Sequence, residues 1–140
     1  VKALPDVPDK TFAEKVLGDG AAIIPEEGKV YAPADGTVAN IMDSKHGIMF
    51  VTDSGAEVLI HIGLDTVNLK GKYFKSYVSD GDKVKKGTLL VEFDLEAIKG
   101  EGYNLITPMV VTNISDYIKA VCMEKENTAI NAGDKFLTVV

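Results

Sequence analysis

Two histidines, His46 and His61, are the residues of this sequence best suited to chemistry near neutral pH. An unperturbed imidazole has a pKa of about 6.5, so it gains and loses protons and acts as a nucleophile in that range. The 140 residues contain only these two histidines and one cysteine. That supply excludes a metal cluster of three or four Cys and His ligands, and it excludes an internal disulfide.

Both histidines belong to a predicted β-hairpin. Two apolar segments, Ile48–Thr52 and Glu57–Ile62, flank the turn sequence Asp53-Ser54-Gly55. A loop of Ser54-Gly55 places His46 diagonal to His61, and a loop of Asp53-Ser54 places it directly opposite. In both registers the imidazoles share one face, with Cβ atoms about 5–8 Å apart. A three-residue loop without a bulge would place them on opposite faces instead.

A pair of imidazoles beside glycines suits the transfer of a bulky charged group. Gly47 and Gly63 each follow one of the histidines closely, which leaves room for a partner. Nε2 of one ring can carry a phosphoryl group while the other ring donates a hydrogen bond to its oxygens. Because the phosphoryl charge is spread over three oxygens, positioning and electrostatic stabilisation dominate its transfer. The pattern alone fits two structural strand histidines equally well.

Short strands dominate the elements that must position these residues. Apolar runs recur about every dozen residues between turn clusters rich in Gly, Asp, Ser and Pro, which is typical of an antiparallel β-sandwich. Helical segments are short and are expected at Thr11–Leu17 and Leu95–Lys99. The predicted fold class is all-β: a compact, barrel-sandwich-like antiparallel sandwich forming one domain over residues 1–140. The predicted strands are Ala21–Ile24, Lys29–Tyr31, Gly36–Met42, Ile48–Thr52, Glu57–Ile62, Tyr73–Val78, Thr88–Phe93, Met109–Ile114 and Lys135–Val140.

Composition excludes several other classes of protein. Hydrophobic residues make up 46% of the chain, enough for a sizeable core. The 15 Lys and Arg residues are outnumbered by 21 Asp and Glu, for a net charge of −6, which is unsuited to nucleic acid or an anionic membrane. No apolar run reaches the roughly 18 residues needed to span a bilayer. The cluster Lys83-Val-Lys-Lys86, beside Asp80 and Asp82, is interpreted as a solvated hairpin.

Several longer motifs carry a family resemblance. The most specific runs from Leu59 to Gly71 and reads Leu-Ile-His-Ile-Gly-Leu-Asp-Thr-Val-Asn-Leu-Lys-Gly. Further matching stretches are residues 7–20, Ala32-Pro-Ala-Asp-Gly-Thr-Val38, Lys45-His-Gly47, Val91-Glu-Phe-Asp94 and Thr107-Pro-Met-Val-Val-Thr-Asn113. Over nearly its whole length the chain resembles the glucose-type enzyme IIA domains of the bacterial phosphoenolpyruvate-dependent sugar phosphotransferase system.

The resemblance implies unequal roles for the two histidines. His61 matches the histidine that is phosphorylated at Nε2, and His46 matches the companion that supports the phosphoryl group. Ser44 occupies a position where members often have a threonine that hydrogen-bonds in the site, so the hydroxyl is kept and a methyl is lost. Asp65 matches an aspartate at the site edge. Gly47 and Gly63 are expected to support the site, with a partner-binding apolar rim drawn from Val38, Ile41, Met42 and Leu59.

The resemblance also implies partners and a location. The chain would act as a phosphotransferase component, with phosphorylated HPr as donor and a cysteine of an enzyme IIB domain as acceptor. The sugar permease domain IIC at the membrane would be served indirectly. No cofactor, metal or nucleic acid is expected. The expected location is the cytoplasm, either as a separate protein or as the cytoplasmic domain of a larger membrane permease.

Two alternative functions fit part of the pattern. A zinc-dependent lysostaphin-like peptidase would use His61, Asp65 and His46 as ligands, but that family needs a His-x-His pair that two histidines cannot also supply. A lipoyl- or biotinyl-like carrier is suggested by residues 80–87, yet no convincing hairpin-tip lysine is present. Zinc content and intact mass, respectively, distinguish these alternatives from a phosphocarrier.

Overall fold

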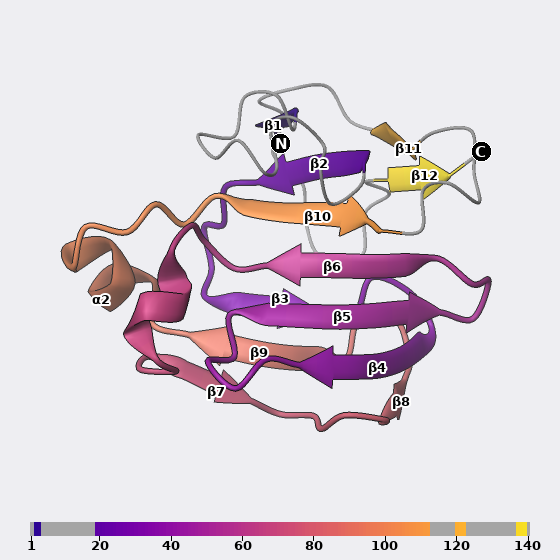
Figure 1. Cartoon of the computed structure of the whole chain (residues 1–140), viewed down its shortest axis with the longest axis horizontal. Helices are drawn as coiled ribbons and strands as arrows, with labels where there is room; N and C mark the ends of the chain where they lie inside the picture. Colours follow the sequence, from indigo (N-terminus) through magenta and orange to yellow (C-terminus); the bar gives the residue numbers. More distant parts are fainter. Residues whose placement is uncertain (1, 4–18, 113–119, 123–136, 140) are drawn as a thin grey trace.

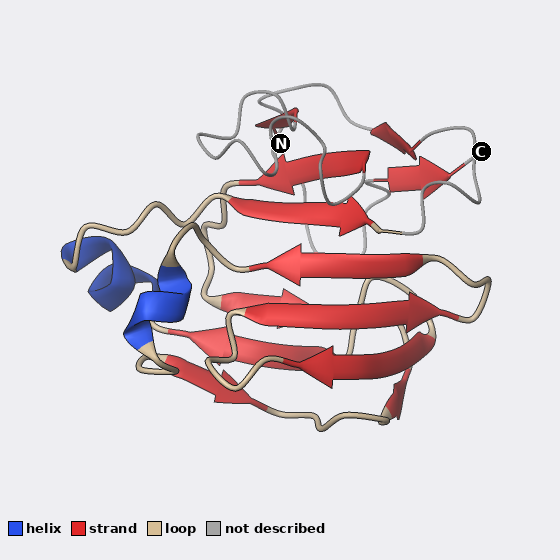
Figure 2. Cartoon of the chain, viewed as in Figure 1, coloured by secondary structure: helices blue, strands red, loops and turns tan. Residues whose placement is uncertain are grey.

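Antiparallel strands form most of the regular structure. The computed structural model describes residues 2–3, 19–112, 120–122 and 137–139. Two short helical elements, α2 (Leu95–Gly100) and the 3-10 helix η2 (Thr66–Leu69), lie at the same end of the strands (Figure 2). The strands are β1 (Lys2–Ala3), β2 (Asp19–Ile23), β3 (Lys29–Tyr31), β4 (Gly36–Ile41), β5 (Gly47–Thr52), β6 (Glu57–His61), β7 (Phe74–Ser76), β8 (Lys83–Val84), β9 (Leu89–Phe93), β10 (Thr107–Val111), β11 (Ala120–Cys122) and β12 (Leu137–Val139).

The strands form two main sheets that pack as a sandwich. One sheet has seven strands in the order β1-β2-β10-β6-β5-β4-β8, and the other has three in the order β3-β9-β7. Figure 1 shows the three-stranded sheet behind the larger one, and β11 pairs separately with β12. Every strand pair is antiparallel. The prediction of an all-β antiparallel sandwich is confirmed.

The main core lies between the two sheets. Ile48 and Phe50 of β5 face inward with no exposed surface, and Ile60 of β6 is 2% exposed opposite Ile48. Leu90 and Val91 of β9 meet them from the second sheet in the same cluster. Burying one such side chain contributes about 1.5–3 kcal/mol relative to leaving it exposed. Because side chains alternate between the two faces of a strand, the residues between these buried positions point away from the main core.

A second apolar cluster uses the other face of the larger sheet. It joins Leu59 of β6 and Val110 of β10, which are register partners, with Ala22, Leu64 and Ile106. Since Val58 and Ile60 lie in the main core and Leu59 lies in this cluster, β6 is buried on both faces. The strand that ends at His61 is thus held from two sides.

Most predicted strand bounds agree with the structure within one or two residues. Strand β8 is an exception, because Lys83–Val84 pairs with the start of β4 where a solvated hairpin was expected. Strands β1 and β11 were also not predicted. The predicted helix at Thr11–Leu17 lies outside the described residues. Helix α2 begins as expected at Leu95, where the Asp94 carboxylate accepts a hydrogen bond from the Ala97 N–H at 3.1 Å.

The register of the β5–β6 hairpin differs from both favoured predictions. Gly47 pairs with His61, and Val51 pairs with Glu57, which leaves Asp53-Ser54-Gly55 as a three-residue loop. The Thr52 N–H donates to the Ala56 carbonyl at 2.9 Å, and Gly55 has φ +98°. A left-handed third residue is what allows a three-residue loop to match the twist of the two strands. The register that forms is therefore the third one, which in a regular hairpin would place the two histidines on opposite faces.

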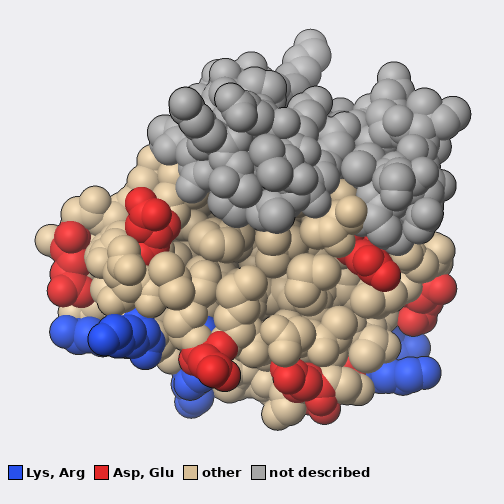
Figure 3. Space-filling view, viewed as in Figure 1, with Lys and Arg blue, Asp and Glu red and all other residues tan. Residues whose placement is uncertain are grey.

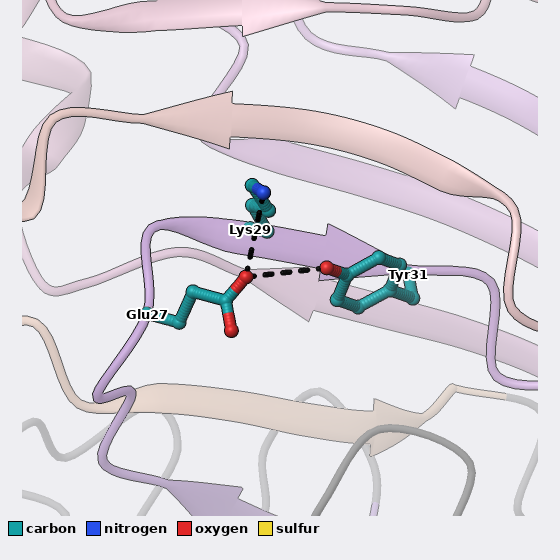
Figure 4. A network of polar contacts seen from close by, with 3 residues as sticks. All are labelled: Glu27, Lys29 and Tyr31. Carbon is teal, nitrogen blue, oxygen red and sulfur yellow. Dashed lines mark hydrogen bonds and ion pairs between the residues drawn. The ribbon is translucent and has the colours of Figure 1, made fainter.

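The outer face of the three-stranded sheet is polar. On β3 and the residues before it, Glu27 accepts a hydrogen bond from the Tyr31 hydroxyl at 3.3 Å and lies 3.6 Å from the Lys29 ammonium (Figure 4). In the register, Glu92 lies between Lys29 and Lys75. Exposed ion pairs of this kind contribute about 0–1 kcal/mol. They keep this face solvated while the opposite face of the sheet packs on the core.

We expect Gly55→Ala to lower the free energy of unfolding by about 1–2 kcal/mol, because a Cβ is disfavoured in the left-handed region. Nothing lies within 4 Å of the added Cβ at Gly55, so the effect is purely conformational. Gly100→Ala is the matched control, since its Cβ also meets nothing and its φ lies outside that region. Urea denaturation of both variants checks this; equal stability would contradict the loop assignment.

Candidate functional site

His61 is the last residue of β6 and is half-buried. Its Nδ1 lies 2.7 Å from the backbone carbonyl oxygen of Gly63. A carbonyl oxygen only accepts hydrogen bonds, so Nδ1 is the protonated nitrogen of the ring. In the neutral ring the lone pair then belongs to Nε2. The local backbone thus sets which nitrogen of His61 is nucleophilic.

His46 lies directly before β5 and is 4% exposed. Its Nδ1 is 2.5 Å from Ser44 Oγ, and its backbone carbonyl accepts the Ile62 N–H at 2.6 Å. The centroids of the His46 and His61 rings are 4.8 Å apart, with the planes inclined at 82°. The prediction that the two imidazoles meet is confirmed.

The histidines meet for a reason that strand pairing does not provide. In the observed register Gly47, not His46, lies opposite His61. His46 precedes the first residue of β5 and follows Lys45, whose φ is +59°. The alternation of side chains between the two faces of a strand does not extend through such a turn. The left-handed residue redirects the chain and brings the His46 ring beside His61.

Burial keeps His46 neutral. Desolvation, and secondarily the charge of neighbouring His61, lower the pKa of His46 from 6.5 to about 4. At neutral pH its ring therefore has one N–H and one lone pair. When the Ser44 hydroxyl donates to Nδ1, the proton of His46 lies on Nε2, where it can be donated to an anion beside His61.

Gly63 is required where it stands. Its φ is +74°, and an added Cβ would lie 2.7 Å from Thr66 Cγ2 and 3.0 Å from the Asn104 carbonyl oxygen. Thr66 is completely buried, and its hydroxyl donates to the Ile62 carbonyl at 2.5 Å. Sequence reasoning missed Thr66. In the sequence, a polar residue after Asp65 indicates only the start of a helix. Nothing in the sequence shows that the Thr66 hydroxyl donates to the carbonyl of Ile62, four residues earlier.

Gly47 gives space to a methionine. The position of a Cβ on Gly47 is 2.5 Å from the sulfur of Met42, so the Met42 side chain lies across the backbone opposite His61. Met42 is 37% exposed, and it belongs to the loop between β4 and β5. An apolar, polarisable side chain therefore borders the imidazole pair on the solvent side.

An open hollow of about 620 Å³ adjoins His46. One wall is the β4–β5 loop and the other is η2 with the residues after it. It is lined by Met42, Asp43, Ser44, His46, Val67, Asn68 and Lys70. Val67 on η2 is 52% exposed and was not predicted as a site residue. Another hollow of about 470 Å³ lies on the three-stranded sheet, between Lys29, Tyr73 and Asp94, and does not include either histidine.

The predicted partner-binding rim needs correction. Val38 has no exposed surface and packs in the main core, and Leu59 is 6% exposed in the second cluster. Both belong to regular strands whose apolar faces are covered, so neither can contact a partner in this conformation. Ile41 is partly buried against the main core. Of the four predicted rim residues, only Met42 is exposed.

Asp65 lies at the entrance to η2 with an exposed side chain. It adopts a left-handed conformation with φ +59°, and its backbone carbonyl accepts the Asn68 N–H at 3.1 Å.

Within the part of the chain that the structure describes, no three His, Cys, Asp or Glu side chains gather closely enough to hold a metal ion. In the same residues no helix has the length and apolarity to cross a membrane.

Fold and site together define a class: a small antiparallel sandwich that presents one imidazole with its lone pair directed to Nε2 beside a second, neutral imidazole. The family model for the phosphoenolpyruvate-dependent sugar phosphotransferase system, EIIA 1, matches residues 1–117. The chain belongs to this family. It is an EIIA phosphocarrier component of the phosphotransferase systems for sugar uptake.

Curated relatives of this chain are both separate proteins and parts of larger ones. The glucose-specific EIIA component of Halalkalibacterium halodurans is 47% identical over 96% of this chain and 77% of that protein. The β-glucoside-specific EIIBCA component of Bacillus subtilis is 53% identical over 84% of this chain. The chain spans only 19% of that EIIBCA protein.

A solved structure supports the fold directly. The glucose permease IIA from Mycoplasma capricolum superposes with a TM-score of 0.84 at 33% sequence identity. The match covers 96% of this chain and 86% of the other. Membership of the EIIA family decides against the zinc peptidase and the lipoyl-type carrier as alternatives.

The lowered pKa of His46 predicts a pH dependence of stability. The folded value of about 4 lies below the unfolded value of about 6.5, so the unfolded chain binds more protons between them. The free energy of unfolding should therefore fall by about 2–3 kcal/mol as the pH is lowered through this range. Urea denaturation at a series of pH values measures the slope. His46→Gln should remove this contribution, and an unchanged slope in that variant would contradict the assignment.

Proposed function

We propose that His61 accepts a phosphoryl group at Nε2 from phosphorylated HPr and passes it to a cysteine of an enzyme IIB domain. In the first step the bond between phosphorus and the donor breaks as the P–Nε2 bond forms. In the second step the P–Nε2 bond breaks as a bond to the cysteine sulfur forms. The observation that carries this proposal is the hydrogen bond from His61 Nδ1 to the Gly63 carbonyl oxygen, 2.7 Å long.

That hydrogen bond favours the reaction at two points. Before transfer it keeps the lone pair of His61 on Nε2, the atom that must attack phosphorus. After transfer the ring is substituted at Nε2 and protonated at Nδ1, and its positive charge strengthens the bond to the carbonyl of Gly63. The same contact therefore supports both the nucleophile and the phosphorylated product.

His46 supplies the second contribution. Burial lowers the pKa of His46 to about 4, so at neutral pH its ring is an uncharged hydrogen-bond donor beside the phosphoryl group. Ser44 Oγ lies 2.5 Å from His46 Nδ1, and a hydroxyl that donates there leaves the His46 proton on Nε2. A prepositioned donor beside developing negative charge stabilises a transition state without reorganising during the reaction. Ser44, Gly63 and Asp65 support this arrangement from the surrounding loops, and Gly47 supports it from the start of β5.

The surface around the pair suits a protein partner. Met42 and Val67, 37% and 52% exposed, flank the hollow next to His46. Figure 3 shows acidic and basic groups around the border of the face formed by the larger sheet, and the hollow itself also includes Asp43 and Lys70. A net charge of −6 would favour the approach of a donor with a basic contact face. Apolar contact excludes water from the phosphohistidine during transfer.

The setting in the cell follows from the same family. We propose that the domain, comprising residues 1–140, works in the cytoplasm, either by itself or joined to EIIB and EIIC domains. The relatives named above differ in the sugar in their names, so we assign sugar selection to the membrane permease domain IIC, which this chain serves indirectly. The proposed function needs no cofactor, metal ion or nucleic acid.

Incubation with phosphoenolpyruvate, enzyme I and HPr should add one acid-labile phosphoryl group to His61, read by intact mass and peptide mapping. His61→Gln should abolish the labelling, because the nucleophile is gone. Labelling of His61→Gln to the wild-type extent would disprove the assignment.

His46→Gln serves as the matched control in the same assay. It should still accept the phosphoryl group, since the His61 nucleophile and its hydrogen bond are intact. Onward transfer to an EIIB domain should slow by about 10²-fold or more, as for loss of an oxyanion-stabilising donor. Onward transfer at the normal rate would rule out the supporting role.

The partner surface has its own test. Val67→Ser should raise the KM for phosphorylated HPr several-fold and leave the maximal rate unchanged, because Val67 would contact the partner and not the phosphoryl group. Tyr77→Ser is the control, since Tyr77 is 45% exposed but lies beyond the end of β7 on the other sheet. Equal KM values for the two variants would place the docking surface elsewhere.

A further inference from the structure

Thr66 differs from the surrounding residues in its chemistry. It is polar, has no exposed surface, and lies at the first position of η2, five residues after His61. Its hydroxyl donates a hydrogen bond to the Ile62 carbonyl oxygen, at 2.5 Å. A buried hydroxyl is costly to desolvate unless it bonds, so this contact is strongly favoured in the folded chain. The contact does not involve either imidazole directly.

The hydrogen bond of Thr66 fixes one of the two peptide groups that flank Gly63. The carbonyl of the Ile62–Gly63 peptide accepts from the Thr66 hydroxyl, and the N–H of Ile62 donates to the His46 carbonyl at 2.6 Å. The other peptide, Gly63–Leu64, is held by the Leu64 N–H, which donates to the Asn104 carbonyl at 2.9 Å. Gly63 is thus held on both sides.

Glycine has wide conformational freedom, so holding it matters. Unrestrained, the Gly63 backbone would sample many φ and ψ values and would turn its carbonyl away from His61. The Thr66 methyl also excludes a larger residue at this position, because Cγ2 lies 2.7 Å from where a Cβ on residue 63 would be. With φ at +74°, the carbonyl instead points at His61 Nδ1.

We propose that Thr66 is a positioning residue that sets the tautomer of His61. Its hydroxyl holds the Ile62–Gly63 peptide on one side of Gly63, and the bond from the Leu64 N–H to the Asn104 carbonyl holds the next peptide. The Gly63 carbonyl, fixed between them, accepts from Nδ1–H and keeps the lone pair of His61 on Nε2. This inference rests on the proposed function, since it assigns Thr66 a role in preparing His61 for phosphoryl transfer. Thr66 itself touches neither the phosphoryl group nor the partner.

The test compares two substitutions that each remove one of the two groups on the Thr66 Cβ. Thr66→Val keeps the branched shape and removes the hydroxyl, whereas Thr66→Ser keeps the hydroxyl and removes the methyl. Nitrogen-15 NMR of His61 reports which ring nitrogen is protonated in each variant, independently of activity. We expect wild type and Thr66→Ser to be protonated at Nδ1, and Thr66→Val to be a mixture of both tautomers.

Phosphorylation rates should follow the tautomer. Thr66→Val should accept phosphoryl groups from phosphorylated HPr about two- to tenfold more slowly than wild type, which corresponds to the loss of one net hydrogen bond. Thr66→Ser should restore most of the rate. A merely structural role would lower stability in both variants without shifting the tautomer.

Thr52→Val is the matched control at the other end of the same hairpin. The Thr52 hydroxyl accepts the Ala56 N–H at 3.0 Å, so its loss also removes a local hydrogen bond. It should reduce stability and leave the His61 tautomer unchanged. A tautomer shift in Thr52→Val equal to that in Thr66→Val would show general loosening and overturn the proposal.

Wild-type protein provides a test that needs no variant to fold. A Thr66 hydroxyl bound to the Ile62 carbonyl should exchange slowly and be visible by proton NMR. Rapid exchange of that proton in the wild type would overturn the role of Thr66. So would a Thr66→Val variant whose His61 tautomer is the same as in the wild type. If Thr66→Val shifts the tautomer but the wild type takes no phosphoryl group, the positioning role stands and the proposed function is rejected instead.

Discussion

The hydrogen bond between His61 Nδ1 and the Gly63 carbonyl is the contact on which the rest of the site depends. It spans only two residues, yet it needs a backbone conformation that a residue with a Cβ rarely adopts, and Gly63 has φ +74°. That conformation is useful only if β6 itself does not move. Burial of β6 on both faces, by the main core and by the cluster around Leu59, meets this requirement.

The pairing of the two imidazoles rests on a compromise between burial and charge. Placing His46 at 4% exposure lowers its pKa and keeps it neutral, which weakens its attraction for an anion. The same burial keeps one N–H of His46 fixed beside His61. Because His46 is uncharged, two positively charged rings 4.8 Å apart are also avoided. A neutral donor held by Ser44 suits a group that must both arrive and leave, because tight binding of the phosphoryl group would slow the second transfer.

The fold class and the contact between the two histidines were both predicted from the sequence, but only the fold class was predicted for the correct reason. Strand spacing and turn residues predicted the sandwich, since apolar alternation carries that information locally. The meeting of His46 and His61 was predicted from a hairpin register that proved wrong. Gly55 at φ +98° makes the loop three residues long, and Lys45 at φ +59° then reorients His46. Positive φ at a lysine has no sequence signal, so a correct conclusion was reached through an incorrect register.

The errors around the site share one physical cause. Val38 and Leu59 are apolar residues near the histidines in sequence, but two sheets and a second cluster use both faces of the strands that carry them. Among the described residues, the exposed large apolar side chains are Ile24, Met42, Val67 and Tyr77, and all four lie outside the strands. Met42 and Val67 are the two that border the hollow beside His46. A partner surface in such a sandwich must therefore be built from loops. The β4–β5 loop and η2 also carry Ser44, His46 and Thr66. In the proposed function, docking and phosphoryl transfer would therefore depend on one set of backbone conformations at one end of the sheets.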